Sequence, residues 1–181
     1  MLPDLTIREE RPADRAAALE VERLAFGSDA EPAIVEAVRD LDGSFGLVAV
    51  DATGRIVGHV QLSRAWIGGA PVVSLGPIGV RPEVQRQGIG GALVRAALDA
   101  ARERDEIAVI LLGSPRYYPR FGFRPVSERG LRNPYTGTQE DGFVVREEDC
   151  MLVALDDRAE ALRGPIRWHP AFGPPTVDDD A

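Results

Sequence analysis

Lysine is absent from this sequence, because all 21 of its basic residues are arginine. A nucleotide-binding loop of the P-loop type needs Lys-Ser or Lys-Thr after its last glycine, so that class of site is excluded. For the same reason, the chain has no lysine side chain of its own that it could modify.

Cysteine and histidine are also scarce. The single cysteine, Cys150, excludes an internal disulfide and is typical of a reducing compartment. The two histidines and the cysteine lie far apart and show no metal-ligand spacing, so we expect no metal site.

Long apolar runs and excess positive charge are missing as well. No run approaches the ~20 residues of a membrane span, and the first residues lack the pattern of a signal peptide, so we expect a cytoplasmic protein without a membrane partner. The formal charge is 21 − 29 = −8, which opposes binding to nucleic acid. It mildly favours a cationic substrate, although solubility explains the charge more simply.

What the sequence does contain is a buried strand at residues 72–80, followed by a glycine-rich loop at the start of a helix. The apolar stripe that predicts this helix is Ile89, Ala92, Leu93, Ala96, Ala97, Ala100 and Ala101. The first turn of a helix has backbone N–H groups without intrahelical partners, and glycine lets a ligand approach them. The pattern therefore predicts an anion site, most often one for phosphate.

Two other interpretations of this loop stay open at this point. The glycines can serve only close packing at a helix start. A dinucleotide fingerprint is a poor fit, because the spacing Gly88-x-Gly90-Gly91 lies deep in the chain and differs from Gly-x-Gly-x-x-Gly.

The remaining pattern predicts a mixed α/β fold around one sheet. A strand at 5–8 precedes a helix from Pro12 to about Gly27 and a second helix that Ser28 or Asp29 caps. We expect their buried stripes to be Ala17, Val21, Leu24 and Ala25, then Ile34, Ala37, Val38 and Leu41. Further strands are predicted at 45–50, 55–66, 107–112, 123–126 and 150–155, and residues 143–145 can form the start of the last one. A helical turn is predicted around 116–118, a loop at 131–142 and a helix-like segment at 156–162. We expect one domain over 1–173 and a disordered acidic tail over 174–181.

Three segments in order resemble the GCN5-related N-acetyltransferases. Residues 85–90, Gln-Arg-Gln-Gly-Ile-Gly, resemble the pyrophosphate loop of that family, and residues 76–80 resemble its pantetheine-binding strand. Residues 117–123 resemble its closing Tyr-x-x-x-Gly-Phe segment. The form of residues 112–125 and of 167–172 is similar to the YhbS-type branch.

The resemblance implies the GNAT acyl-CoA N-acyltransferase fold, with a central, mostly antiparallel sheet flanked by helices. It implies acetyl-CoA as cosubstrate and direct acetyl transfer to an amine acceptor, either a small molecule or a peptide. The cofactor-binding residues that it implies are Ile78, Gly79, Val80, Gln85, Arg86, Gln87, Gly88, Ile89, Gly90, Gly91 and Ser114. Ser114 stands where the family often has asparagine. A homodimer is one assembly that this interpretation allows.

The reaction poses three chemical needs. A backbone N–H of Val80 or Ile78 is implied as the donor to the thioester oxygen. Tyr118 matches the family's tyrosine, whose phenol can donate a proton to the leaving thiolate. No residue is selected as the base that deprotonates the amine. The carboxylates available for this role are Glu22, Glu31 and Glu83, and a relay through water is equally compatible with the sequence. His59 is more simply interpreted as a structural residue.

Two alternative functions remain. The chain could bind acyl-CoA as a sensor or interaction module without turnover. Transfer through Cys150 is disfavoured, because it lies in an apolar strand without a histidine motif beside it. In the family, the loop between the first two helices borders the acceptor site. The resemblance therefore makes four residues weak candidates for contact with the acceptor, although each is also explained by packing or helix capping: Phe26, Ser28, Asp29 and Glu31.

Overall fold

The structure is a computed structural model that describes residues 5–139 and 144–174. The chain divides into two units, Met1–Ser63 with Leu75–Ala101, and Arg64–Ser74 with Arg102–Ala181. Strands β3 and β4 each contribute residues to both units. The fold is a mixed α/β arrangement in which most strand pairs are antiparallel, as the sequence predicted.

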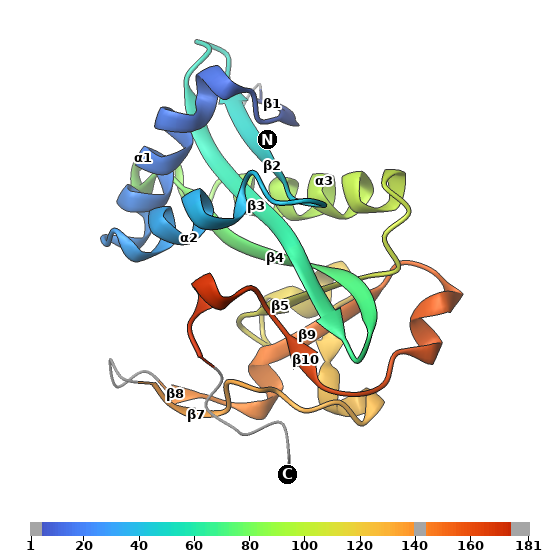
Figure 1. Cartoon of the computed structure of the whole chain (residues 1–181). Helices are drawn as coiled ribbons and strands as arrows, with labels where there is room; N and C mark the ends of the chain where they lie inside the picture. Colours follow the sequence, from blue (N-terminus) through green and yellow to red (C-terminus); the bar gives the residue numbers. More distant parts are fainter. Residues whose placement is uncertain (1–4, 140–143, 175–181) are drawn as a thin grey trace. The chain divides into compact units, whose positions relative to one another are not determined.

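In the first unit, three helices flank the strands in the order β1-β2-β3-β4. The strands are β1 (Leu5–Glu9), β2 (Phe45–Asp51), β3 (Ile56–Ile67) and β4 (Ala70–Val80). The helices are α1 (Arg15–Phe26), α2 (Ala30–Val38) and α3 (Ile89–Glu103). Side chains alternate along β3, so Gly58 faces α3 while His59 faces Glu22 on α1. Helices α1 and α2 thus lie on one side of the strands and α3 on the other (Figure 1).

In the second unit, the strand order is β4-β5-β9-β6, and β10 pairs with the end of β3. These strands are β5 (Ala108–Leu112), β6 (Arg124–Pro125), β9 (Cys150–Ala154) and β10 (Ile166–Arg167). The short pair β7 (Gly137–Thr138) and β8 (Val144–Val145) stands apart from them. Strand β5 runs parallel to β4, with Val73 opposite Val109, which is the strand–helix–strand crossover that the sequence predicted.

The helix faces agree with the prediction only in part: Val21 and Val38 are buried as expected, and other members of the predicted stripes are not. Leu24 is 42% exposed and Leu41 is 40% exposed, whereas Ala18, Val21 and Glu22 are the buried residues of α1. In α2 the buried residues are Pro32, Val35 and Val38, so Ala37 points away from the core. Within each helix the cause is a shift of about one residue in the facing direction, which at 100° per residue replaces some side chains by their neighbours. Leu41 is exposed because α2 ends before it, at Val38.

Smaller corrections concern the second unit. The strand predicted at 123–126 is only Arg124–Pro125, and the helix-like segment is a 3-10 helix, Asp157–Ala161. Strand β9 does not begin at 143–145, because a 3-10 turn at Glu147–Asp149 separates it from β8. Residues 140–143 of the predicted loop, with Phe143, and 175–181 of the predicted tail lie outside the described residues.

Candidate functional site

The predicted anion loop is an exposed turn that ends where α3 begins. A 3-10 helix, Pro82–Val84, leads into residues 85–88, all of which are exposed, and α3 starts at Ile89. Arg86 has φ 61° and Gly88 has φ 88°, both in the left-handed region. These two reversals let the chain pass from an extended strand into the helix within four residues, and they leave the first N–H groups of α3 facing the loop.

Arg81 fixes the beginning of this loop. Its backbone N–H donates to Val57 O at 2.9 Å, and its Nε donates to Ile56 O at 2.9 Å. Its Nη2 reaches Glu20 of α1 at 2.6 Å, and the side chain is only 6% exposed. Gln85, four residues later, donates to Val80 O at 2.9 Å. The loop is therefore tied to β3, β4 and α1 of the same unit.

Gly58 fixes the position of the helix start. A Cβ on Gly58 would lie 2.9 Å from Leu93 Cδ1 and 3.2 Å from Ile89 Cγ2, both in the first turns of α3. A larger residue fits at this point of β3 only if the side chains of Leu93 and Ile89, or the helix that carries them, shift. This requirement cannot be read from the sequence, because Ile89 and Leu93 follow Gly58 by more than thirty residues.

The residues predicted on β4 lie at its C-terminal end. Ile78 and Val80 are half-buried, and Gly79 between them is buried. A Cβ on Gly79 would lie 2.7 Å from Glu22 Oε2 and 3.1 Å from Ala25 Cβ, so α1 packs directly on this part of the strand. Ile78 and Val80 therefore face away from α1, as the alternation of a strand requires.

A buried ionisable pair lies behind Gly79. Glu22 and His59 are both 0% exposed, and Glu22 Oε1 lies 2.6 Å from His59 Nδ1. Burial raises the pKa of Glu22 above its usual range, and the hydrogen bond and charge of His59 oppose that rise. His59 Nε2 in turn lies 3.8 Å from Glu10 Oε2, and Glu10 Oε1 lies 3.5 Å from Arg39 Nη2.

This pair is the part of the site that the sequence did not predict. Glu22 and His59 are 37 residues apart, and neither lies in a recognisable motif. One signal was present: Ala18, Val21 and Ala25 stand at i−4, i−1 and i+3 from Glu22, which places the carboxylate on the apolar face of α1. His59 was interpreted as structural, and its 0% exposure is compatible with that role.

Tyr118 belongs to the second unit, in the 3-10 helix Tyr118–Phe121. Its ring packs edge-on against Phe123 at 5.7 Å and Tyr117 at 5.1 Å between centroids. A Cβ on Gly113 would lie 2.8 Å from Tyr118 Cδ2, so the ring rests on the glycine backbone. Burial, and secondarily Tyr117, raises the pKa of Tyr118 to about 12. The phenol is therefore protonated at neutral pH.

Ser114 and Cys150, also in the second unit, are engaged in local structure. Ser114 is exposed, and its Oγ accepts a hydrogen bond from Arg116 N at 3.3 Å. Its carbonyl accepts from the amide of Tyr117 at 2.9 Å, which makes it the start of the turn before Tyr118. Cys150 is fully buried in β9, and burial raises the pKa of its thiol well above the usual value. Such a thiol is a poor nucleophile.

Most of the weak acceptor-site candidates form hydrogen bonds or ion pairs with neighbouring residues of α1 and α2. The Ser28 hydroxyl donates to Glu31, and Ser28 Oγ accepts from Ala30 N at 3.2 Å in the turn before α2. Asp29 pairs with Arg23 at 2.6 Å. Phe26 is 47% exposed at the end of α1. These contacts are local to the turn between α1 and α2, and Asp29, at the N-cap of α2, makes no side-chain capping bond. Phe26 is the member with an exposed apolar surface.

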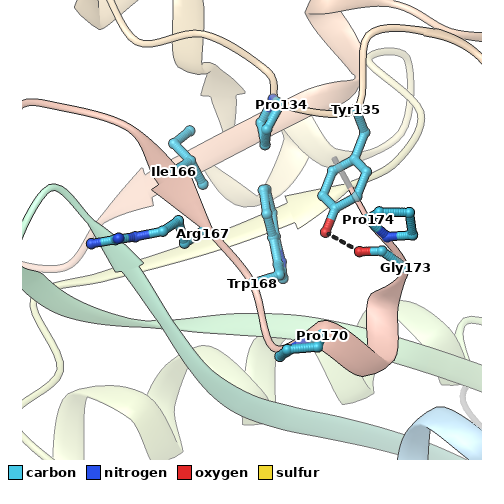
Figure 2. Close-up of a pocket in the computed structure, with 8 residues that line it drawn as sticks. All are labelled: Pro134, Tyr135, Ile166, Arg167, Trp168, Pro170, Gly173 and Pro174. Carbon is cyan, nitrogen blue, oxygen red and sulfur yellow. Dashed lines mark hydrogen bonds between the residues drawn. The ribbon is translucent and has the colours of Figure 1, made fainter. Parts of the chain in front are cut away.

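An apolar pocket lies in the second unit (Figure 2). Its volume is about 420 Å³, and it is lined by Pro134, Tyr135, Ile166, Arg167, Trp168, Pro170, Gly173 and Pro174. Trp168 and Tyr135 meet edge to face at 5.4 Å, and Tyr135 OH donates to Gly173 O at 3.3 Å. Figure 2 shows the Arg167 guanidinium directed away from the other lining side chains, so the lining is mostly aromatic and proline.

Over residues 5–139 and 144–174, no group of three or more His, Cys, Asp and Glu side chains is arranged to hold a metal ion. In the same described residues, no helix combines the length and apolar character needed to cross a membrane.

Comparison with known proteins identifies the family. The family model described as "Acetyltransferase (GNAT) family" matches residues 15–123. The chain is 33% identical over 172 residues to "Uncharacterized N-acetyltransferase YhbS" of Escherichia coli (strain K12), which covers 93% of this chain and 98% of that protein. It is also 33% identical over 156 residues to "Uncharacterized N-acetyltransferase YjhQ" of the same strain, covering 82% and 83%.

Two solved structures are similar over nearly the whole chain. The YhbS protein of Escherichia coli in complex with CoA matches with a TM-score of 0.83 and 31% identity, covering 94% of this chain and 92% of that one. A GNAT family acetyltransferase from Brucella melitensis in complex with acetyl-CoA matches with a TM-score of 0.71 and 29% identity, covering 93% and 97%. The chain therefore belongs to the GNAT family of N-acetyltransferases, as the loop at 85–90 and the Tyr-x-x-x-Gly-Phe segment indicated.

Proposed function

We propose that this N-acetyltransferase binds the pyrophosphate of acetyl-CoA at residues 85–91 and transfers the acetyl group directly to an amine. The observation that supports the site most strongly is the exposed turn with two left-handed residues that ends on the N-terminus of α3. Related GNAT structures contain CoA or acetyl-CoA. The exposure of Gly88 argues against a packing role for that glycine, whereas Gly91, one turn into α3, is buried.

The residues of the loop fit an anionic group. Backbone N–H groups of Gly88, Ile89, Gly90 and Gly91 are the donors that a helix start offers, and the helix dipole favours negative charge there. The side chains of Gln85, Arg86 and Gln87, next to these groups in the chain, are exposed, and Arg86 adds a positive charge that can pair with phosphate. We assign all seven residues to the cofactor.

The end of β4 is assigned to the rest of the cofactor. In this proposal, the backbone of Ile78, Gly79 and Val80 hydrogen-bonds the pantetheine arm, and the N–H of Val80 or Ile78 donates to the thioester oxygen. That donor would stabilise the negative charge that the oxygen gains in the tetrahedral intermediate. Ser114 is a secondary candidate for a cofactor contact, although its hydroxyl oxygen already caps the turn before Tyr118.

Tyr118 is assigned to the leaving thiolate. Its phenol is protonated at neutral pH, since burial holds its pKa at about 12, and it can therefore donate a hydrogen bond to the sulfur. Cys150 has no part in the proposal, because a thiol buried in β9 with a raised pKa does not form the thiolate that a covalent intermediate needs. Direct transfer with both substrates bound follows.

The remaining parts of the proposal are coarser. We propose that residues 1–173 act as one N-acetyltransferase domain, that the protein works in the reducing cytoplasm, and that its acceptor is a small-molecule or peptide amine. A homodimer is compatible with this assignment. The alternative, a sensor that binds acyl-CoA without turnover, would use the same loop residues, so turnover is the property that separates the two.

Cofactor binding by the loop is tested with Gly90→Val. This glycine has no positive φ, so valine should fold there while its side chain blocks the approach of the pyrophosphate. Gly88→Val is less useful than the sequence suggested, because φ 88° strains any larger residue. The matched control is Gly69→Val, in the exposed β3–β4 turn, where a Cβ meets nothing within 4 Å.

Titration calorimetry with acetyl-CoA provides the measurement. We expect the control to bind as the natural chain does, and Gly90→Val to lose at least tenfold in affinity, about 1.4 kcal/mol. Equal affinity in a correctly folded Gly90→Val would remove the loop assignment. CoA release with a panel of primary amines then separates the acetyltransferase from the sensor.

A further inference from the structure

An amine acceptor needs a base, and the sequence offers three carboxylates for that role without distinguishing them. Their surroundings in the structure differ. Glu83 is exposed and paired with Arg55 at 2.7 Å, and its own backbone amide together with Arg55 lowers its pKa. A carboxylate of lowered pKa is a weak proton acceptor. Glu31 receives the hydrogen bond of the Ser28 hydroxyl at the start of α2. The carboxylates of Glu83 and Glu31 are therefore both engaged in local interactions at the protein surface.

Glu22 differs from them in three ways. It is 0% exposed, its Oε1 is bound to His59, and its second oxygen, Oε2, makes no hydrogen bond of good geometry to any described residue. Oε2 also lies against Gly79, 2.7 Å from the point where a side chain would begin. Oε1 of the carboxylate is thus fixed by its hydrogen bond to His59, while Oε2 is directed at the strand that we assign to the cofactor.

The charges around this carboxylate suit a base. Burial raises the pKa of Glu22, and the negative charge of Glu31 on α2 raises it further. The hydrogen bond and charge of His59 on β3 lower this pKa, as does the backbone amide of Gly79. Behind His59 lie Glu10 and then Arg39, at 3.8 Å and 3.5 Å. Burial is the largest of these influences, so Glu22 accepts a proton more readily than an exposed glutamate does.

We propose that Oε2 of Glu22 accepts the proton of the acceptor amine beside Gly79, and that His59 positions this carboxylate through its hydrogen bond to Oε1. The assignment rests on the proposed function, since it requires that the acetyl group lies at the end of β4. It adds a catalytic residue, Glu22, and a positioning residue, His59, to Tyr118.

The protons balance as follows. The ammonium group of the acceptor gives one proton to Glu22, directly or through one water, and becomes a neutral amine. The amine nitrogen attacks the thioester carbon, a C–N bond forms, and the C–S bond then breaks. The second proton leaves the nitrogen as the amide forms and ends on the sulfur of CoA, while the proton on Glu22 returns to solvent.

Glu22 is buried near the exposed end of α1. It lies one turn before the end of α1, and one turn of an α-helix spans about 5.4 Å. Ala25, which contacts Gly79 from the same helix face, is half-buried, and Phe26 is 47% exposed. An acceptor that packs on Phe26 would reach the Gly79 segment across this last turn of the helix.

The pH dependence of Glu22→Gln provides the test. The probe is the best acceptor from a panel of primary alkylamines, and kcat/KM is followed by CoA release. At neutral pH we expect a loss of ~10²–10⁴-fold, the usual contribution of a general base. Above the pKa of the amine, near ~10, the acceptor is already neutral, so the loss should shrink to within about tenfold.

The controls separate catalysis from folding. Glu83→Gln should behave as the natural chain, and acetyl-CoA affinity by calorimetry should be unchanged in both variants. A merely structural role for Glu22 predicts a deficit that is the same at every pH. If Glu22→Gln does not fold, Glu22→Asp keeps the charge but withdraws it by one methylene, and a natural kcat/KM in that variant would overturn the inference.

His59 has its own readout. Because His59 lowers the pKa of Glu22, His59→Ala should move the acid limb of the kcat/KM profile to higher pH. His59→Gln, whose amide can still donate to Glu22, should restore part of that shift. An unmoved acid limb in His59→Ala contradicts the positioning role. If the natural chain binds acetyl-CoA but Glu22→Gln keeps full activity at neutral pH, the inference fails while the proposed function stands; if the natural chain acetylates no amine of the panel, both fail.

Discussion

Replacing Tyr118 by phenylalanine tests the most specific residue that the family resemblance supplied. The substitution keeps the ring and its contacts with Phe123 and Tyr117 and removes only the hydroxyl. The sequence alone predicted a general acid, for which the usual contribution is ~10²–10⁴-fold in rate. The structure changes this magnitude.

Burial raises the pKa of Tyr118 to about 12, while a thiol of the cysteine type has a pKa near ~8.5. Full transfer of the phenol proton to such a thiolate is uphill by a difference of about 3.5, or about 5 kcal/mol at 1.36 kcal/mol per pKa unit. Tyr118 is therefore better suited to donate a hydrogen bond than to give up its proton. A hydrogen bond to a charged group contributes about 1.5–3 kcal/mol, which corresponds to roughly 10–150-fold in kcat.

The assay is steady-state CoA release with a saturating alkylamine, together with calorimetry for acetyl-CoA. We expect Tyr118→Phe to lose roughly 10–150-fold in kcat with little change in cofactor affinity. The matched control is Tyr117→Phe, because the Tyr117 ring packs against Phe121 at 5.4 Å and under Arg120 at 4.5 Å. Gly113→Ala should reproduce the defect, since its Cβ would displace the Tyr118 ring.

Three outcomes would refute this reasoning. Full kcat in Tyr118→Phe removes the residue from the reaction. A loss well above ~10³-fold indicates complete proton transfer, and then the pKa of Tyr118 in the working enzyme is far below about 12. An equal loss in Tyr117→Phe indicates that the aromatic cluster, and not the hydroxyl, is what the reaction needs.

Two further predictions concern packing and covalent chemistry. Gly58→Ala should lower the free energy of unfolding by about 1–3 kcal/mol, measured by denaturant titration, because its Cβ would lie 2.9 Å from Leu93 Cδ1; an unchanged midpoint, with Gly69→Ala as control, would mean that α3 adjusts at no cost. Cys150→Ala should keep its activity, and intact-mass measurement after incubation with acetyl-CoA should find no acetyl adduct on the natural chain. An adduct that disappears together with activity in Cys150→Ala would contradict direct transfer.

The cofactor loop could be predicted from the sequence because its signals are local. Strand, turn, glycines and helix stripe follow one another within residues 72–101, and each depends on neighbours a few residues away. The structure places α3 at Ile89, where the stripe begins, and it places left-handed φ values at Arg86 and Gly88. The glycine was foreseeable, whereas Arg86 was not, because a residue other than glycine gives no sequence signal of that conformation.

The Glu22–His59 pair could not be predicted, because its signal is not local. The apolar pattern of α1 counted Leu24 as buried, and the structure exposes 42% of it, while a glutamate occupies the buried face. Hydrophobic patterns assume that polar residues point outward, and the exception here depends on a histidine 37 residues away. A buried polar pair is the kind of feature that functional sites impose against local preference.

Glycine has two separate uses in this site, and only one of them was visible in the sequence. Gly88 lies in the exposed loop and Gly90 lies, half-buried, in the first turn of α3, where the missing side chain leaves room for a ligand. At Gly58, Gly79 and Gly113 the space of the side chain is taken by Leu93, by Glu22 and by the Tyr118 ring, respectively. These three glycines let a helix, a carboxylate and a phenol approach the backbone more closely than alanine allows. Motif matching finds the first group, since it lies in one segment, whereas the second group becomes visible only when each glycine is set against its neighbour in space. The proposed catalytic groups, Glu22 and Tyr118, are both held by glycines of the second group.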